Sequence, residues 1–271
     1  MPTLNITGKT TVYGIIADPI DHVRAPMVFN PAFEAYGIDA VMVPFHVTPD
    51  DLPAAIAGMK VMPNFGGLTI TVPHKVAMMA LCDELGASAR RVGAANAARF
   101  TEDRRLIGDN FDGQGYVAGV TKGGFDFTGK RVLQAGAGGA GMAIAFAVAE
   151  AGAAAITIAN RTVAKAAALA DRVRAAFPAC DVTGTAADIA PAGFDIMVNT
   201  TSLGLHAGDA LPIDVDALDP GTVVSEIIMI PEETELLARA KAKGHPVHYG
   251  RPMLDEQARL IAAFIGCPFP D

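Results

Sequence analysis

The hydrophobic positions of this chain fall into short apolar runs that alternate with segments of helical period. Apolar and β-branched runs at 11–16, 41–46 and 68–71 predict strands. Between and after them, helical spacing predicts helices over 25–36, 51–59 and 75–85. Residues 96–107 are typical of a hairpin bent at Glu102-Asp103. The alternation predicts an α/β fold with parallel strands.

A second alternating series begins at Arg131. The runs RVLQAG, AAITIAN, FDIMVNT and GTVVSEII predict strands, with helices near 140–151, 163–177 and 233–243. A last helix over 253–265 follows a Gly-Arg-Pro break. The chain has no internal repeats or low-complexity segments, so we expect two folded domains joined by short hinges.

Composition limits the function classes. A length of 271 residues favours two domains, and 51% hydrophobic residues supply their cores. The chain shows neither a membrane span nor a signal peptide, so we expect a cytoplasmic protein. A net charge of −8 without a basic stripe argues against nucleic-acid binding. The three cysteines are far apart, as expected for reduced, mostly buried thiols.

A glycine-rich loop follows the strand RVLQ. Gly136, Gly138 and Gly141 have the spacing GxGxxG between a strand and a helix, the context in which this motif binds a dinucleotide. The first glycine permits the tight turn, the second admits the pyrophosphate, and the third allows close packing of helix on strand. We expect these three glycines and Gly139 to contact the cofactor.

The residues after the next strand indicate which dinucleotide binds. An NAD enzyme usually carries an acid there for the ribose 2′-hydroxyl. This chain has Asn160-Arg161-Thr162 instead, with Lys165 one turn further on. Arg161 and Lys165 suit a 2′-phosphate, although a solvated surface arginine is the alternative. The sequence therefore predicts NADP, with these four residues around it.

Three segments before the glycine loop carry polar residues at predicted strand ends: TITVPHK (69–75), GAAN (93–96) and GDNFDG (108–113). Taken alone, Lys75 could be a solvated helix residue and Asp112 a helix N-cap. Oxidising a secondary alcohol requires a group that takes the hydroxyl proton while hydride leaves. A lysine beside a carboxylate can move that proton, because the pKa of lysine falls readily on burial.

Seven ordered motifs make the chain resemble the shikimate dehydrogenase family over nearly its whole length: TVPHK, GAxN, GxNxDGxG, GAGGAG, NRTxxK, NTTSLG and GxxMLxxQA. The resemblance implies that Lys75 and Asp112 form the catalytic pair. It also implies that Thr71, Asn96 and Gln257 hold the substrate, and that Thr200 and Gly250 join the cofactor site.

The same resemblance implies the domain organisation. An N-terminal α/β substrate-binding domain should comprise 1–108 and 250–271, and a Rossmann-type domain should comprise 109–249. The C-terminal helix would then return to the first domain, and the active site would lie in the cleft between domains.

One part of the family pattern is missing. The family carries His-Ser-x-Ser-Pro after the first strand, and both hydroxyls bind the substrate carboxylate. Here the run is His22-Val23-Arg24-Ala25-Pro26, so Val23 and Ala25 occupy the two serine positions. The next family histidine is Phe29, the family asparagine before TVPHK is Thr69, and the tyrosine of the Asp-x-x-Tyr-x-Pro run is Met229. Either another donor such as Arg24 has taken over, or the substrate differs at this end.

We therefore expect an NADP-dependent oxidoreductase acting on shikimate, 3-dehydroshikimate or a related cyclic polyol acid, as in aromatic amino acid biosynthesis. Quinate and aminoshikimate are alternative substrates. A non-catalytic nucleotide-binding regulator and a folate-type methylene dehydrogenase are alternative functions. We expect a monomer or homodimer with small-molecule partners, and no metal, since His245-x-x-His248 lacks a third ligand.

Overall fold

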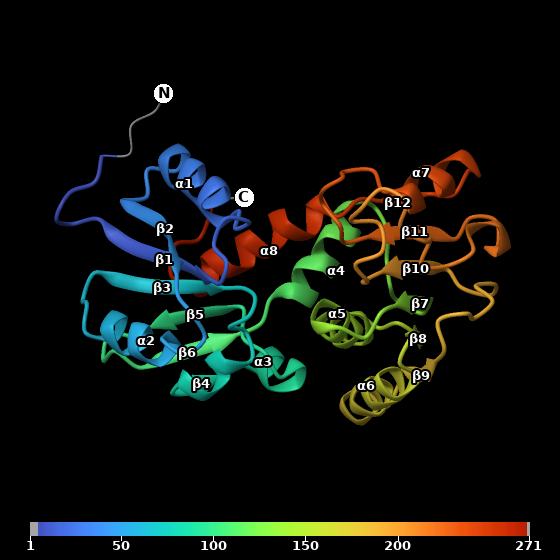
Figure 1. The fold of residues 1–271 in the computed structure, drawn as a ribbon, viewed down its shortest axis with the longest axis horizontal. Helices are drawn as coiled ribbons and strands as arrows, with labels where there is room; N and C mark the ends of the chain where they lie inside the picture. Colours follow the sequence, from blue (N-terminus) through green and yellow to red (C-terminus); the bar gives the residue numbers. More distant parts are fainter. Residues whose placement is uncertain (1–4, 270–271) are drawn as a thin grey trace. The chain divides into compact units, whose positions relative to one another are not determined.

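The computed structural model describes residues 5–269 and divides the chain into two compact units (Figure 1). Among the described residues, unit 1 contains 5–111 and 257–269, and unit 2 contains Asp112–Glu256. The boundaries expected from the sequence, after residues 108 and 249, lie slightly earlier in the chain. The first observed boundary falls inside the GDNFDG segment. Residues 1–4 and 270–271 of the expected first domain lie outside the described range.

Unit 1 is built on a six-stranded mixed sheet in the order β2-β1-β3-β5-β6-β4. Strand β1 pairs in parallel with β2 and β3, whereas β5 and β6 form the antiparallel hairpin that the sequence predicts. The strands are β1 (Thr11–Ala17), β2 (Ala40–His46), β3 (Phe65–Ile70), β4 (Glu84–Leu85), β5 (Ala97–Phe100) and β6 (Leu106–Asp109). The C-terminal ends of β1, β3 and β6 and the N-terminal end of β5 therefore lie at one edge of the sheet.

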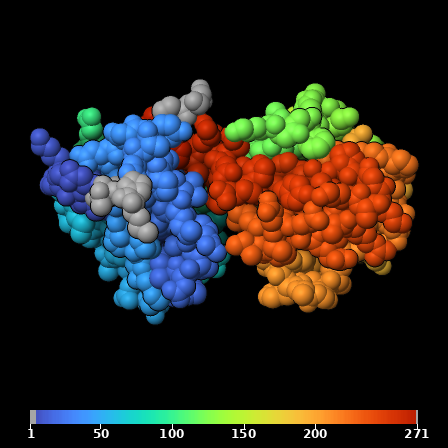
Figure 2. All heavy atoms as spheres, turned by 90° about the horizontal axis from the view of Figure 1, so that it is seen from above, coloured from blue at the N-terminus to red at the C-terminus, as the bar shows by residue number. Residues whose placement is uncertain are grey.

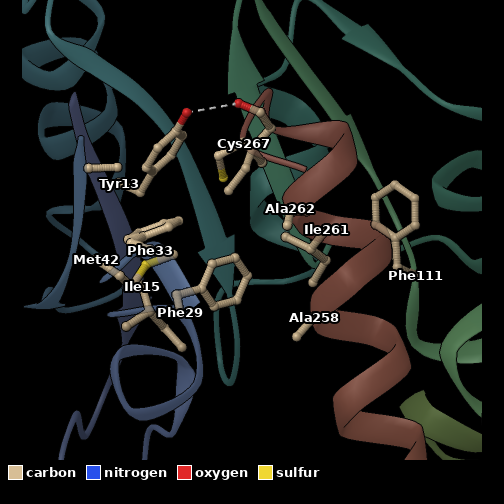
Figure 3. Close-up of a cluster of buried hydrophobic side chains, with 13 residues drawn as sticks. Tyr13, Ile15, Phe29, Phe33, Met42, Phe111, Ala258, Ile261, Ala262 and Cys267 are labelled. Carbon is tan, nitrogen blue, oxygen red and sulfur yellow. Dashed lines mark hydrogen bonds between the residues drawn. The ribbon is translucent and has the colours of Figure 1, made fainter. Parts of the chain in front are cut away.

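Two apolar clusters form the core of unit 1. The first contains Phe29 and Phe33 of α1, and Figure 3 shows these rings opposite Ala258 and Ile261 of α8. The second packs α2 and the short helices against β1 and β3. The helices that begin in unit 1 are α1 (Ala25–Ala35), α2 (Leu52–Lys60), α3 (Ala87–Val92) and the 3₁₀ helix η1 (Ala77–Leu81).

Unit 2 contains a six-stranded sheet in which every described pair is parallel. Its order, β12-β11-β10-β7-β8-β9, is that of a doubly wound dinucleotide-binding fold. The strands are β7 (Arg131–Ala135), β8 (Ala155–Ala159), β9 (Asp181–Thr185), β10 (Ile196–Asn199), β11 (Val223–Glu226) and β12 (Val247–His248). The expected α/β architecture with a Rossmann-type domain is confirmed.

Helices connect and cover these strands. Helix α7 packs its buried Leu236 and Leu237 on the cluster that includes Leu133 and Val224. Atoms of the late part of unit 2, coloured orange to red, form most of the face of this unit seen in Figure 2. The remaining helices are α4 (Asp112–Lys122), α5 (Gly139–Glu150), α6 (Val163–Ala176), η2 (Val215–Ala217), α7 (Glu235–Ala242) and α8 (Arg251–Phe264).

Helix α8 belongs to both units. Its first residues lie in unit 2, where Pro252 packs on α4 at Gly119 and Glu256 forms an ion pair with Lys122 at 2.7 Å. From Gln257 onward the helix belongs to unit 1 and fills the core there. The segment directly after α8 contacts β1, because Tyr13 Oη donates a hydrogen bond to Ile265 O at 3.3 Å (Figure 3).

A buried polar chain fixes α4 on the sheet of unit 2. Tyr116 Oη donates to Ser225 Oγ at 2.9 Å, and Ser225 Oγ lies 3.1 Å from Nδ1 of His248. Burial raises the pKa of Tyr116 and lowers the pKa of His248, so both stay neutral and bridge α4 to β11 and β12.

Most of the predicted elements agree with the structure to within a few residues, but the helix predicted over 75–85 is wrong. Only the 3₁₀ helix η1 forms there. Asp83 N donates to Leu106 O at 2.8 Å and Gly86 N donates to Gly108 O at 2.7 Å. The segment between them therefore pairs with β6 and forms β4, the outermost strand of the sheet. Pairing with β6 overrides the local helical pattern. Elements α3, β4, β9, β12 and η2 were not predicted from the sequence.

Close packing of α4 on α5 generates a stability prediction. A Cβ added at Gly113 would lie 2.1 Å from Ala143 O of α5. Gly113→Ala should therefore push the helices apart and cost about 1–3 kcal/mol of unfolding free energy. Thermal melting should show a lower Tm. Gly58→Ala in α2 is the control, because a Cβ there meets nothing within 4 Å and alanine favours helix. A Gly113→Ala protein as stable as wild type would contradict the prediction.

Candidate functional site

Hydrogen bonds in unit 1 bring together the three segments expected to carry the chemistry. Ile70 N donates to Asn96 O at 2.7 Å, and Ala95 N donates to Lys75 O at 2.8 Å. On the other side, Asn96 N donates to Asp109 O at 3.0 Å. The TVPHK turn, the GAAN turn and the end of β6 are therefore adjacent at one edge of the sheet.

Polar side chains brace this edge. The buried Asn96 accepts a hydrogen bond from Phe111 N at 2.9 Å, and the buried Asn110 donates to Ala94 O at 3.0 Å. Asp109 Oδ1 accepts from Asn110 N, at 2.8 Å. These bonds satisfy backbone groups in an irregular buried segment, where an unpaired group is costly.

Asp109 also accepts a hydrogen bond from the N-terminus of α3, although it lies far from that helix in the sequence. Its Oδ1 accepts a hydrogen bond from Ala89 N at 2.8 Å, in the first turn of α3. A Cβ at Gly86 would overlap this carboxylate, so a glycine is required before the helix. These roles of Asp109 and Asn110 were not predicted, although both residues lie inside the GDNFDG motif.

The other expected catalytic and substrate residues are distributed over both units. Thr71 and Lys75 follow β3 and are half-buried, and the half-buried Gln257 lies in α8 where that helix enters unit 1. The buried Asp112 is the first residue of α4 in unit 2. The structure of unit 1 thus brings Thr71, Lys75 and Asn96 onto one sheet edge.

The residues at the two serine positions of the family motif lie in the loop between β1 and α1. Val23 and Ala25 are half-buried and pack against the first apolar cluster of unit 1. Arg24 is exposed and its guanidinium contacts the sulfur of Met27 at 3.7 Å. Phe29 is 2% exposed and meets the ring of Phe33 edge-on, so it fills the core where the family has a polar histidine.

In unit 2, two buried side chains hold the glycine loop. Gly136 has a φ of +107°, a conformation that favours glycine. Gln134 Nε2 donates to the carbonyl oxygens of Gly136 and Gly141 at 2.8 and 2.9 Å. Thr200 Oγ1 donates to Ala135 O at 2.8 Å. The turn is therefore rigid, and Thr200 supports the loop through its hydroxyl.

The four glycines of this loop differ in what surrounds them. A Cβ at Gly141 would lie 2.7 Å from Gly136 O, so internal packing requires that glycine. A Cβ at Gly138 or Gly139 meets nothing within 4 Å, and neither residue has a positive φ. Glycine loses more conformational entropy on folding than other residues, and nothing in the fold requires a glycine at these two positions. Their open backbone at the start of α5 fits the close approach of a phosphate group.

The residues after β8 lie next to the loop. Asn160 Oδ1 accepts a hydrogen bond from Ala137 N at 3.2 Å, and its Nδ2 donates to Thr162 O at 2.9 Å. Thr162 is the N-cap residue of α6. Arg161, Thr162 and Lys165 are exposed, so both cations are accessible to a ligand phosphate.

Glu226, the acid at the end of β11, is fully buried. It accepts hydrogen bonds from Asn199 Nδ2 at 3.0 Å and Thr234 Oγ1 at 3.2 Å. The amides of Ile227 and Ile228 donate to it at 2.8 and 3.1 Å. Burial raises the pKa of Glu226, and these four donors oppose the shift. Glu226 therefore supports the loop after β11, a role that was not predicted from the sequence.

Gly250 is required for close packing rather than for an unusual backbone conformation, because its φ is not positive. A Cβ there would lie 2.3 Å from Ile228 O, so Gly250 packs directly on the loop that Glu226 supports. The structure thus gives Gly250 a packing role in unit 2.

Two further features concern metal and membrane binding. Within residues 5–269, His, Cys, Asp and Glu side chains form no cluster of three or more that could hold a metal ion. Among the helices of that same range, none has the length and hydropathy needed to cross a bilayer.

Known proteins resemble this chain in sequence and in structure. Residues 15–98 match the shikimate dehydrogenase substrate binding domain, and residues 120–204 match the shikimate / quinate 5-dehydrogenase domain. A shikimate dehydrogenase (NADP(+)) of Geobacter metallireducens is 36% identical over 96% of this chain and 92% of its own length. One of Geobacillus kaustophilus is 39% identical over 92% of this chain and 90% of its own length.

Several solved structures cover 98% of this chain. A shikimate dehydrogenase in complex with NADP+ has a TM-score of 0.91 at 31% identity, over 93% of its own chain. The ligand-free 5-ketofructose reductase of Gluconobacter sp. strain CHM43 has a TM-score of 0.90 at 33% identity, over 96% of its own chain. The resemblance inferred from the seven motifs is thereby confirmed, and the chain belongs to the shikimate dehydrogenase family.

Proposed function

We propose that this chain is an NADP-dependent dehydrogenase that transfers a hydride between the cofactor and a hydroxyl or ketone carbon of shikimate or a related polyhydroxylated compound. The observation that carries the proposal is the hydrogen-bonded edge of unit 1, where Thr71, Lys75 and Asn96 are adjacent. A nucleotide-binding regulator without catalysis has no use for a lysine held at that edge. Relatives named for shikimate and NADP(+) support the same reaction.

We assign the two units to the two ligands. Unit 1 is the substrate-binding domain, and unit 2 is the NADP-binding domain. Gly138 and Gly139 leave room for the pyrophosphate at the N-terminus of α5, where partial positive charge favours anions. Arg161 and Lys165 would neutralise the 2′-phosphate, as their exposure after β8 allows.

The reaction balances with the groups present. In the oxidative direction the C–H bond of the reacting carbon breaks, and NADP+, held by the glycine loop and the cations after β8, would accept its hydrogen as a hydride with both electrons. The O–H bond also breaks, and its proton passes to the Lys75 and Asp112 pair and then to water. The products are a ketone, NADPH and a proton. Asn96, Thr71 and Gln257 hold the other hydroxyls in place.

The relatives leave room for more than one substrate of this kind. One solved structure is named a quinate dehydrogenase in complex with NAD, with a TM-score of 0.89 at 29% identity. The 5-ketofructose reductase is similar to this chain to a comparable degree. An absorbance assay of NADP+ and NAD+ reduction with shikimate, quinate and neutral polyols tests substrate and cofactor together. Absence of any turnover would contradict the proposed function.

Removing either member of the catalytic pair should abolish most activity. Lys75→Ala and Asp112→Asn should each lower kcat by at least about 100-fold, since a positioned acid or base contributes roughly that much or more. The Kd for NADP+, measured by fluorescence titration, should stay near the wild-type value. Lys241→Ala in α7 is the matched control, because that lysine and its partner Glu233 are both exposed. Full activity in either variant would remove the pair from the mechanism.

The cations after β8 should set the cofactor preference. Arg161→Ala and Lys165→Ala should each lower kcat/KM for NADP+ by about tenfold or more, because each loses a charge-assisted contact to the 2′-phosphate. Values for NAD+ should change little. Arg239→Ala, an exposed arginine of α7 paired with Asp216, should change neither. A wild-type enzyme that prefers NAD+ would contradict this assignment.

Two alanine substitutions in the glycine loop should separate binding from folding. Gly138→Ala should weaken NADP+ binding by about tenfold or more, since a methyl group blocks approach of the pyrophosphate, and it should leave the Tm unchanged. Gly141→Ala should lower the Tm, because its Cβ meets Gly136 O at 2.7 Å. Unchanged NADP+ affinity in Gly138→Ala would show that the open glycines serve another purpose.

A further inference from the structure

The loop after β1 lies beside the proposed substrate residues. Thr71 N donates to Ile16 O at 3.2 Å, and Asp18 N donates to Val72 O at 3.3 Å. The loop therefore leaves β1 next to Thr71 and ends at Ala25, where α1 begins. Any substrate held by Thr71 and Asn96 has this loop as a neighbour within unit 1.

The second half of the loop offers a carboxylate no side-chain hydroxyl. Val23 and Ala25 are apolar, half-buried and packed on the core. The intervening Arg24 is exposed, with its guanidinium on the sulfur of Met27. Arg24 is also the N-cap residue of α1 and forms no side-chain capping bond there, and Pro26 has no N–H to donate. The two positions that face the core therefore give an anion no side-chain donor, and the basic side chains of this half, His22 and Arg24, are exposed.

The first half of the loop carries negative charge. Asp18 Oδ1 lies 2.8 Å from Nε2 of His46, at the ends of β1 and β2. An ionised aspartate only accepts hydrogen bonds. Asp18 can therefore accept a hydrogen bond from a substrate hydroxyl, whereas it has no donor for a substrate carboxylate, and its imidazole partner already occupies one of its oxygens. Asp21, further along the loop and exposed, has the same sign of charge.

From these two observations we infer that the substrate group facing this loop is neutral and hydroxylated. The preferred substrate is then a polyol or its ketone without a carboxylate, rather than shikimate itself. The inference rests on the proposed function, because it concerns the substrate of the same site. Its physical basis is the cost of bringing a carboxylate out of water without donors to replace its hydration.

A matched pair of ligands tests the charge alone. Shikimate and its carboxamide have the same ring, the same hydroxyls and nearly the same shape, but only the acid is charged. The kcat/KM of the carboxamide should exceed that of shikimate by about tenfold or more, the size expected when one charged partner is missing. Neutral acyclic polyols such as sorbitol and mannitol should also be oxidised with NADP+ in preference to shikimate.

The outcomes distinguish this inference from the proposed function. Shikimate preferred over its carboxamide would overturn the inference and leave the dehydrogenase function standing. It would show that Arg24 or the N-terminus of α1 receives the carboxylate. An enzyme that oxidises neither the acids nor the neutral compounds would overturn the proposed function and the inference with it.

Variants of the loop provide the second test. Val23→Ser combined with Ala25→Ser should shift the ratio of kcat/KM for shikimate over carboxamide toward the acid by roughly tenfold, since two donors are restored. Asp18→Asn should shift it in the same direction by removing a like charge. Ala35→Ser and Glu34→Gln, at exposed positions of α1, are the matched controls and should leave the ratio unchanged. If the loop variants fold, with wild-type Tm, and keep the wild-type ratio, the inference is overturned.

Discussion

The irregular backbone at the ends of the strands contains buried amide and carbonyl groups that no sheet partner can satisfy, and both units depend on polar side chains that do so. Asn96 and Asn110 perform this task in unit 1. Gln134 and Glu226 perform it in unit 2. Because these side chains are buried and paired, the loops they hold are rigid before any ligand arrives. The reactive groups can then lie on loops without losing position.

Glycine has three separate functions in this molecule. Gly136 permits a positive φ, and Gly113, Gly141 and Gly250 permit close contact between backbone segments. Gly138 and Gly139 serve neither purpose, which is the reason to assign them to a ligand. A glycine motif alone does not separate these cases, whereas the surroundings of each Cβ position do. All three functions occur in unit 2, around its glycine loop and the start of α4.

The sequence was sufficient where local patterns and packing agree. The long periodic helices and four parallel strands of unit 2 (β7, β8, β10 and β11) follow from spacing, and the glycine loop follows from its context. The helix expected over 75–85 failed because β4 forms by pairing with β6, an interaction between segments that the local pattern does not contain. The bracing residues were missed for a similar reason. The sequence does mark Gln134 and Glu226, because they are polar residues within or at the end of apolar strands. Polar side chains at such buried positions need hydrogen-bond partners.

The sharing of α8 determines when each part of the protein can fold during its synthesis. Residues 5–111 leave the ribosome before unit 2, yet the cluster around Phe29 and Phe33 is incomplete until Ala258, Ile261 and Ala262 arrive. Unit 2 is continuous in sequence and can form as soon as its own residues have emerged. The N-terminal segment therefore lacks the α8 side chains of this cluster while about half of the chain is made. Chaperone demand and aggregation risk should be concentrated in this interval, and a circular permutant that begins at α8 would shorten it.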